Sequence, residues 1–362
     1  MTDILIAGGG IIGMMTAREL LLAGASVRVL ERQATGRESS WAGGGILSPL
    51  YPWRVAEPIN RLFLWSHHHY PALVQSLAET TGIDPEWTRS GLLVADHWGE
   101  PGEQQAIEGW AEQYGLSLEW WAPHTAQTRA AHLAWNGCVP LFLPDIAQVR
   151  NPRLLAAVRQ DIIRMGADIR EHEPVRRIVL ERDAVRGFET RTGVYAADTY
   201  IMATGAWSDT LGLELDTQTD SIHPVKGQML IFPAAVGTLQ HILLSRGKYL
   251  IPRKDGRILT GSTLEYTGFD KTTTDEALQE LMGFARSWLP DIPIVVEKHW
   301  AGLRPGSRLG IPRIARHPHL ANLYFNCGHF RNGFVMAPAS ARLLTDQILG
   351  RDSFTEIPAY QW

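Results

Sequence analysis

The sequence predicts a fold of two parts: an α/β domain with a parallel sheet and an α+β domain built on an antiparallel sheet. The first part follows from an apolar strand over residues 3–7, helix-spaced apolar residues over 11–23 and a second strand over 26–30. A strand, a helix and a strand within about 30 residues form the unit that builds parallel sheets. The second part follows from residues 225–262, where apolar and polar residues alternate around a turn at 254–256.

The remaining segments add helices and strands to these two parts. Apolar residues at helical spacing predict helices over residues 56–81, 102–114, 151–165, 274–288 and 338–349. Short apolar or alternating runs predict strands over residues 91–94, 168–170 and 199–203, and a hairpin over 175–192.

Composition and charge exclude several classes of protein. The 362 residues carry 34 basic and 38 acidic side chains, a net charge of −4, and contain no basic tract. We therefore expect neither nucleic acid nor an anionic membrane as partner. Cys138 and Cys327 have no disulfide or zinc spacing, and the uncharged run at 228–245 is interrupted by Pro233 and Gly237. We expect a reduced, cytoplasmic protein without integral membrane contact.

Three glycines between the first strand and the first helix predict a dinucleotide site. In Gly8-x-Gly10-x-x-Gly13, one glycine serves the tight turn, one the approach of a pyrophosphate and one the packing of helix on strand. The helix N-terminus offers free amides to the phosphates. Glu31 ends the second strand, where a carboxylate accepts hydrogen bonds from ribose hydroxyls and disfavours a 2′-phosphate.

Two further segments favour FAD over NAD as the dinucleotide. Residues 37–45, RESSWAGGG, follow the second strand and supply hydroxyls and a second glycine-rich stretch. Residues 204–208, TGAWS, include Gly205 and follow the buried strand over 199–203. An NAD domain has no need of the first segment and usually continues into further strand and helix units.

Seven runs of residues resemble a known family, the amine-oxidising flavoproteins that include D-amino acid oxidase, sarcosine oxidase and glycine oxidase. The runs are GGGIIG, GRESSWAGGGILSPLYPW, VRNPRL, PVKGQM, YLIPRKDGRILTGSTLE, HWAGLRPGS and NCGHFRNGFVMAPAS. The last four are much more specific than the glycine motif, and the similarity to glycine oxidases extends along nearly the whole chain. It implies a Rossmann-like FAD-binding domain of the D-amino acid oxidase type with an inserted substrate domain.

The resemblance, together with the motif glycines, implies a set of cofactor-binding residues. They are Gly8, Gly10, Ile11, Ile12, Gly13, Glu31, Arg32, Ser39, Ser40, Gly43, Gly44, Gly45, Val175, Gly205, His329, Phe330, Arg331, Asn332, Gly333, Phe334 and Val335. In the family, residues matching 329–335 run beneath the isoalloxazine ring, where a helix N-terminus stabilises the reduced flavin. Monomeric sarcosine oxidases attach their flavin through a cysteine in the stretch matching 301–312; this chain has none there, which implies non-covalent FAD.

The substrate-binding and catalytic residues implied by the family are Arg304, Arg331 and Tyr249. A guanidinium grips an α-carboxylate through two parallel hydrogen bonds. The family's arginine equivalent to Arg304 does this, with the match to Arg331 near the same carboxylate and the match to Tyr249 donating its hydroxyl. By residue type alone, each arginine would more often form a surface salt bridge and the tyrosine would pack in a core.

The implied activity is oxidative deamination of glycine, with sarcosine and small D-amino acids as lesser substrates. A hydride passes from the substrate Cα to flavin N5, water hydrolyses the imine to a 2-oxo acid such as glyoxylate and ammonia, and O₂ is reduced to H₂O₂. The resemblance further implies that the imine supplies the thiazole of thiamine. It also implies a homo-oligomer, a tetramer, as the assembled form.

The expected domains are discontinuous. Residues 1–80, 145–220 and 305–362 are expected to form the FAD-binding domain, and residues 81–144 and 221–304 the substrate-binding domain. His67-His68-His69 suggests a metal site, but consecutive helical residues point about 100° apart and cannot converge on one ion. We therefore expect no metal, and we expect Cys327 to be a small buried filler.

Several alternatives remain open at this point. The enzyme alternatives are an oxidase of sarcosine or another N-substituted glycine, and a D-amino acid dehydrogenase that passes electrons to a quinone. A tRNA-modifying oxidase is disfavoured by the net charge. A silent flavin-binding module could do without Arg304 and Tyr249, which are both present. Residues 247–248 and Leu264 are candidates for the rest of the pocket lining.

Overall fold

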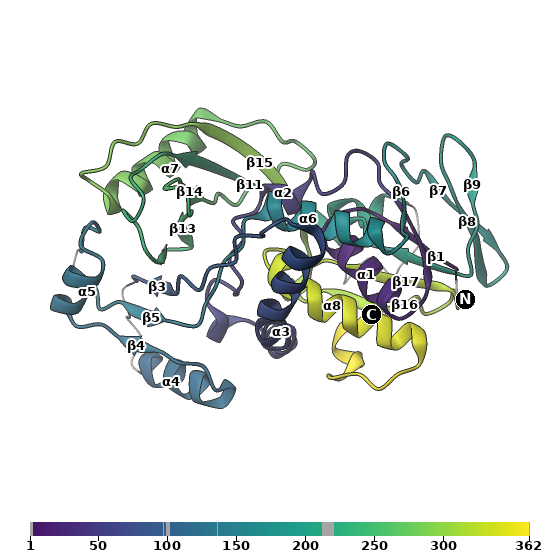
Figure 1. Ribbon diagram of the computed structural model, residues 1–362, viewed down its shortest axis with the longest axis horizontal. Coiled ribbons are helices and arrows are strands. Elements are labelled where there is room, and N and C mark those ends of the chain that lie inside the picture. Colours follow the sequence, from purple (N-terminus) through teal and green to yellow (C-terminus); the bar gives the residue numbers. More distant parts are fainter. Residues whose placement is uncertain (1–2, 97, 99–101, 136, 212–220, 362) are drawn as a thin grey trace.

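The computed structural model describes residues 3–96, 98, 102–135, 137–211 and 221–361. Two sheets form two lobes that lie side by side, and both chain ends lie in the lobe that contains the first strand (Figure 1). A six-stranded sheet organises this lobe and an eight-stranded sheet organises the other. The lobes meet at the segments that follow the strands over residues 3–7 and 26–30.

The six-stranded sheet is the parallel sheet expected from the N-terminal unit. Its strand order is β16 (Arg313–Arg316), β17 (Leu323–Cys327), β10 (Thr199–Met202), β1 (Asp3–Ala7), β2 (Ser26–Leu30) and β6 (Asp168–Arg170). All neighbours pair in parallel except β16, which runs antiparallel to β17 at one edge.

Both faces of this sheet are covered, which explains why its central strands are almost entirely apolar. Ile4 and Ile6 of β1 face a core shared with four helices: α1 (Ile11–Leu22), α3 (Glu57–Thr81), α6 (Asn151–Arg164) and α8 (Gly333–Leu349). Leu5 and Ala7 face the opposite core, beneath a small sheet of β7 (Arg177–Glu181), β8 (Ala184–Glu189) and β9 (Val194–Tyr195).

The eight-stranded sheet builds the second lobe. Its order is β15 (Lys298–Gly306), β11 (His223–Phe232), β14 (Ile258–Gly261), β13 (Lys248–Pro252), β12 (Ile242–Ser245), β3 (Leu92–Val94), β5 (Leu141–Leu143) and β4 (Glu119–Trp120). The pairs are antiparallel, as predicted, with the exception of β12 and β3, which run parallel. Helix α7 (Asp275–Trp288) packs on β11 and β14.

Short helices complete the described chain. They are α2 (Ser39–Ala42), α4 (Glu103–Tyr114) and α5 (Pro123–Arg129), and the 3₁₀ turns η1 (Pro52–Arg54), η2 (Gly205–Leu211), η3 (Arg308–Gly310) and η4 (Ile357–Tyr360). The predicted helices and strands are present with ends that shift by at most three residues, apart from the last helix. The hairpin over 175–192 gains a third strand, β9, that the sequence pattern did not predict.

The predicted start of the last helix at Pro338 is wrong, because α8 begins at Gly333 and contains that proline. A proline inside a helix leaves the carbonyl four residues earlier without its amide partner. Here the hydroxyl of Tyr70, from α3, donates to that carbonyl, on Phe334. The neighbouring amide of Ala339 donates to Ser66 Oγ at 3.1 Å. Two α3 side chains thus compensate for the interruption.

The division into two discontinuous domains remains a proposal. The strands of the two sheets fall almost entirely within the ranges proposed for the two domains. Strands of the six-stranded sheet lie within residues 1–80, 145–220 and 305–362. Strands of the eight-stranded sheet lie within 81–144 and 221–304, except that β15 continues to Gly306. Residues 212–220, at the proposed boundary, lie outside the described residues.

Candidate active site

The three motif glycines form the turn that the sequence predicts between β1 and α1. Gly8 has a φ of +109°, and a Cβ there would stand 2.3 Å from the Ala203 carbonyl oxygen. A Cβ on Gly13 would stand 1.9 Å from the Gly8 oxygen, so this glycine allows α1 to pack against the turn. Only glycine fits these two positions. The first helix amide, on Ile11, donates to Ser40 Oγ at 3.0 Å.

Glu31 lies beside this turn, at the end of β2. Its side chain is buried, and it accepts hydrogen bonds from the amides of Gly9 at 2.7 Å and Gln33 at 2.9 Å. A carboxylate has about four lone-pair sites, so capacity remains for ribose hydroxyls. Its neighbour Arg32 pairs with Glu38 and lies 3.4 Å above the ring centroid of Trp207, in η2. These side chains form one end of a cavity.

The cavity has a volume of about 380 Å³ and connects the glycine turn to the second lobe. Volumes of this size are typical of small-molecule sites. The predicted residues that line it are Gly8, Gly10, Ile11, Ile12, Glu31, Arg32, Ser39, Ser40, Gly43, Gly44, Gly45, Val175, Gly205, Tyr249, Arg304, His329, Phe330, Arg331, Asn332, Gly333 and Phe334. Gly13 acts from behind the turn, and Val335 is buried in α8; neither lines the cavity.

The middle of the cavity is bounded by the glycine loop Gly43–Gly45 and by the start of α8. Gly45 has a φ of +77°, and a Cβ there would lie 2.2 Å from the Val149 oxygen. On the other side, His329 donates or accepts a hydrogen bond with Ser340 Oγ at 3.0 Å. Burial lowers the pKa of His329 to about 3, so its imidazole is neutral at physiological pH.

Arg304, on β15, lies at the second-lobe end of the cavity. Its Nη1 donates to the carbonyl oxygens of Lys226 at 3.2 Å and Thr263 at 3.3 Å, and its Nη2 donates to Ser262 Oγ at 2.6 Å. These three bonds leave the Nε hydrogen and one Nη2 hydrogen available to grip a carboxylate. The pKa of Arg304 is lowered to about 10; burial is the main cause, and the charge of Arg331 acts in the same direction.

No carboxylate lies within 4 Å of the guanidinium of Arg304 or Arg331 in the part of the chain that the structure describes. Glu31 and Glu38 are the described carboxylates that line the cavity, and both belong to its opposite end. Glu38 forms an ion pair with Arg32 and a second one with Lys271, at 3.0 Å. Two cations without a paired acid therefore meet at one end of the cavity, which suits an anionic ligand.

Tyr249 lies between the glycine loop and Arg304. The residue is buried on β13, and its hydroxyl is 3.6 Å from Met229 Sδ on β11. A Cβ on Gly261, in the strand between them, would lie 3.1 Å from that hydroxyl, so the glycine opens the space that the tyrosine occupies. A Cβ on Gly44 would lie 3.3 Å from the Tyr249 ring.

Some pocket candidates from the sequence do not line the cavity. Lys248 forms an ion pair with Glu280 at 2.7 Å, Leu264 is exposed, and Gly247 donates its amide to Tyr51 Oη at 3.0 Å. Sequence reasoning missed Ser262 and Asn326, which do line it. Asn326 donates to Thr16 Oγ1, and its buried Oδ1 has no partner among the described residues. The alternation of residues along a strand does not show that Ser262 accepts a hydrogen bond from the Arg304 guanidinium.

The histidine run and the free cysteines show no sign of metal chemistry. No group of three or more possible metal ligands occurs among the described residues. His69 stacks on Trp65 with centroids 3.6 Å apart, and the Nδ1 of His68 lies 2.7 Å from the Leu64 oxygen. Cys327 is buried, as expected, and also lines the cavity. No described helix is long and apolar enough to cross a membrane.

The fold and site define an FAD-dependent oxidoreductase. The family model described as "FAD dependent oxidoreductase" matches residues 3–347, and the chain belongs to that family. The glycine turn, the carboxylate at the end of β2 and the unpartnered Oδ1 of Asn326 fit FAD as the cofactor. Both the predicted cofactor and the predicted fold class are confirmed.

The relatives of this chain include several glycine oxidases. The chain is 42% identical to glycine oxidase from Pseudomonas aeruginosa, over 99% of this chain and 97% of that protein. It is 40% identical to glycine oxidase from Pseudomonas putida, with the same two coverages. The crystal structure of glycine oxidase from Geobacillus kaustophilus superposes with a TM-score of 0.92 at 26% identity, covering 100% of this chain and 98% of that one.

Proposed function

We propose that the protein catalyses oxidative deamination of small amino acids, with glycine as the main substrate. The product is an imino acid, which water hydrolyses to a 2-oxo acid and ammonia. FAD, when bound, would supply the two-electron oxidation of the substrate Cα–H bond, with O₂ as the final electron acceptor and H₂O₂ as its reduced product. The observation that carries the proposal is the pair of cations in the FAD-binding cavity, Arg304 and Arg331, for which the described residues provide no paired acid.

Arg304 supplies the carboxylate site. Three acceptors hold its guanidinium, so binding a carboxylate through the two remaining hydrogens costs little ordering entropy. A planar fork fixes both the position and the orientation of the substrate, whereas a lysine would fix position alone. Arg331 adds a second positive charge at the same end, and Tyr249 offers its hydroxyl as a further donor.

The proposed reaction needs little acid–base catalysis from the protein. The carboxylates among the described cavity-lining residues belong to the opposite end, and His329 is neutral. A neutral substrate amine can release its Cα hydride without a protein base, so orientation by Arg304 and Tyr249 is the main contribution of this end. At the other wall, the N-terminus of α8 presents a partial positive charge that favours a negatively charged reduced cofactor.

The residues proposed to hold FAD come from the lobe of the six-stranded sheet. The glycine turn and the N-terminus of α1 suit the pyrophosphate, and Glu31 suits the ribose. We propose non-covalent binding. Cys327 is the cysteine that lines the described cavity, and burial raises the pKa of its thiol to about 12, which makes it a poor nucleophile.

Two further parts of the proposal concern the setting of the reaction. The resemblance of the sequence motifs to the glycine oxidase family supports a role in supplying the glycine imine for the thiazole of thiamine. The same similarity supports a homotetramer, for which light scattering of the purified holoenzyme is the test. A mass near four times 40.3 kDa is expected, and a monomer would contradict it.

The test of the reaction is peroxide release by the purified yellow protein in air. Glycine, sarcosine, D-alanine and N-ethylglycine are compared at matched concentrations. A kcat/KM for glycine at or above that for sarcosine supports the proposal. A larger secondary amine far ahead of glycine would keep the reaction and replace the substrate. Flavin bleaching by glycine without peroxide would indicate a dehydrogenase with another electron acceptor.

A further inference from the structure

Arg253 joins the two lobes at the glycine loop Gly43–Gly45. It follows β13, where its backbone pairs with Arg257 in a turn. Its Nη2 donates to the Gly44 oxygen at 2.8 Å, and its Nη1 donates to Gln148 Oε1 at 2.8 Å and to the Val149 oxygen at 3.0 Å. One guanidinium from the second lobe therefore holds two separate segments of the first.

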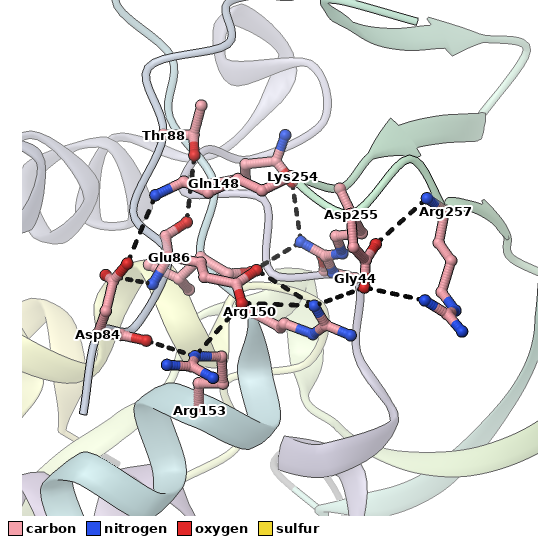
Figure 2. A network of polar contacts seen from close by, with 12 residues as sticks. Gly44, Asp84, Glu86, Thr88, Gln148, Arg150, Arg153, Lys254, Asp255 and Arg257 are labelled. Carbon is pink, nitrogen blue, oxygen red and sulfur yellow. Dashed lines mark hydrogen bonds and ion pairs between the residues drawn. The ribbon is translucent and has the colours of Figure 1, made fainter. Parts of the chain in front are cut away.

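All three acceptors of Arg253 are neutral, and no described carboxylate forms an ion pair with it. The nearby acids are engaged by other arginines, as Figure 2 shows for the network around them. Arg150 pairs with Glu86 at 3.3 Å and with Asp255 at 2.9 Å, and Arg257 pairs with Asp255 at 3.2 Å. Burial is the main cause that lowers the pKa of Arg253 to about 10.

A buried cation without an ion pair is a poor source of stability. Replacing buried charges with well-packed apolar side chains is often neutral or stabilising. The hydrogen-bond geometry of Arg253 therefore points to a role in positioning, because one of its donors binds the Gly44 oxygen, in a loop that lines the FAD cavity.

The loop that Arg253 holds has little freedom of its own. The Gly45 oxygen accepts the Val149 amide at 2.9 Å, and a Cβ on Gly44 would stand 2.6 Å from Ile251 Cδ1. The same Cβ would stand 3.3 Å from the ring of Tyr249. Gly44 thus lies directly on β13, and Arg253 is the side chain that ties its carbonyl to the end of that strand.

We propose that Arg253 is a positioning residue, which acts through Gly44 to hold the FAD-binding glycine loop against Tyr249. FAD affinity and amino acid binding are then coupled through one guanidinium. The second half of this inference rests on the proposed function, since it concerns how the loop and Tyr249 are spaced for an amino acid substrate.

The experiment compares Arg253→Met, Arg253→Lys and the matched control Arg257→Met. Arg257 belongs to the same turn but pairs with Asp255 and with Glu297 at 2.7 Å, and it does not touch the glycine loop. FAD affinity is measured by flavin fluorescence on adding FAD to each apoprotein, and apoprotein Tm is recorded. KM and kcat for glycine are then measured at saturating FAD.

We expect Arg253→Met to raise the FAD Kd by about tenfold or more, the effect of losing one or two charged hydrogen bonds. Its KM for glycine should rise at least about fivefold at saturating FAD. The apoprotein Tm separates these two effects from the loss of stability that three acceptors without a donor would cause. Arg253→Lys should recover part of both losses, because it retains the charge with fewer donors. Arg257→Met should leave both constants unchanged.

Three results would overturn the inference. One is an FAD Kd and a KM for Arg253→Met within twofold of the parent values, and another is an equal loss in Arg257→Met. If Arg253→Met does not fold, Arg253→Lys decides: unchanged constants overturn the inference and a raised FAD Kd supports it. FAD titration needs no substrate, so a protein that fails to oxidise glycine would refute the proposed function and leave the effect on FAD readable.

Discussion

Gly227 provides the space in which the Arg304 guanidinium lies. A Cβ on Gly227 would stand 2.1 Å from Nη2, 2.3 Å from Nη1 and 2.4 Å from Cζ of Arg304. The two residues belong to the paired strands β11 and β15, in which Val225 faces Arg304 and Gly227 faces Gly302. The arginine thus crosses its neighbouring strand at the one position without a side chain.

Gly227→Ala should therefore displace Arg304 and weaken amino acid binding without affecting FAD. We expect the KM for glycine to rise about tenfold or more, because the guanidinium loses its fixed direction. The FAD Kd should stay within twofold, since Gly227 does not line the described cavity. The matched control is Gly109→Ala in α4, where a Cβ meets nothing within 4 Å. A parental KM in Gly227→Ala would show that Arg304 does not bind the substrate.

Tyr249→Phe removes only the hydroxyl that faces the carboxylate end of the cavity. The ring still packs against Gly44, so the FAD spectrum should not change. The loss of one hydrogen bond to a charged ligand corresponds to about 1.5–3 kcal/mol, or roughly a 10- to 150-fold lower kcat/KM. Steady-state peroxide assays measure it. A kcat/KM equal to that of the parent would reduce Tyr249 to a packing residue.

Tyr70→Phe tests how the chain tolerates Pro338 inside α8. Without the hydroxyl, the buried Phe334 carbonyl has neither a helix amide nor a side-chain donor. We expect a loss of about 1–3 kcal/mol in the free energy of unfolding, measured by urea denaturation of the apoprotein. Tyr266→Phe is the control, because Tyr266 is exposed and its substitution should change stability by at most about 0.5 kcal/mol. Equal stabilities for the two variants would refute the compensation.

His329 makes the stability of the apoprotein depend on pH. Burial lowers its pKa to about 3, so between pH 6.5 and 3 the unfolded chain binds a proton that the native state does not. Its contribution is therefore complete above pH 6.5 and is lost as the pH falls. The slope from this group is about 1.4 kcal/mol per pH unit between pH 6 and 4. His329→Gln should reduce the slope of urea-derived stability against pH by that amount, and an unchanged slope would contradict a buried neutral histidine.

Much of the fold could be predicted from local patterns. The strand β1 has a nearly continuous apolar sequence because both faces of its sheet are covered. The local pattern could not predict the start of α8, because proline marks a break and the donor that compensates for it, Tyr70, lies 264 residues away. The family resemblance, by contrast, implied a helix N-terminus within residues 329–335, and α8 begins at Gly333. The parallel pairing of β12 with β3 likewise joins distant segments that carry no local signal.

The site could be predicted where a motif dictates backbone geometry. Gly8 is required by its φ of +109° and Gly13 by its close contact with the Gly8 oxygen, so both constraints lie within one turn and the spacing alone indicates them. Arg304 and Tyr249 could be predicted only from the family resemblance. An arginine on a strand has no sequence feature that distinguishes a substrate-binding residue from a surface residue. The contributions of Gly227 and Arg253 depend on which strands lie side by side, and only the structure supplies that information.

The most direct test of the account is kcat/KM for glycine in Arg304→Lys, with the FAD content of each preparation determined from its absorbance. We expect the variant to remain yellow and to lose about 100-fold or more in kcat/KM, because a point charge replaces a planar fork at the carboxylate. A yellow variant with a near-parental kcat/KM would remove Arg304 from the substrate site and contradict the central claim.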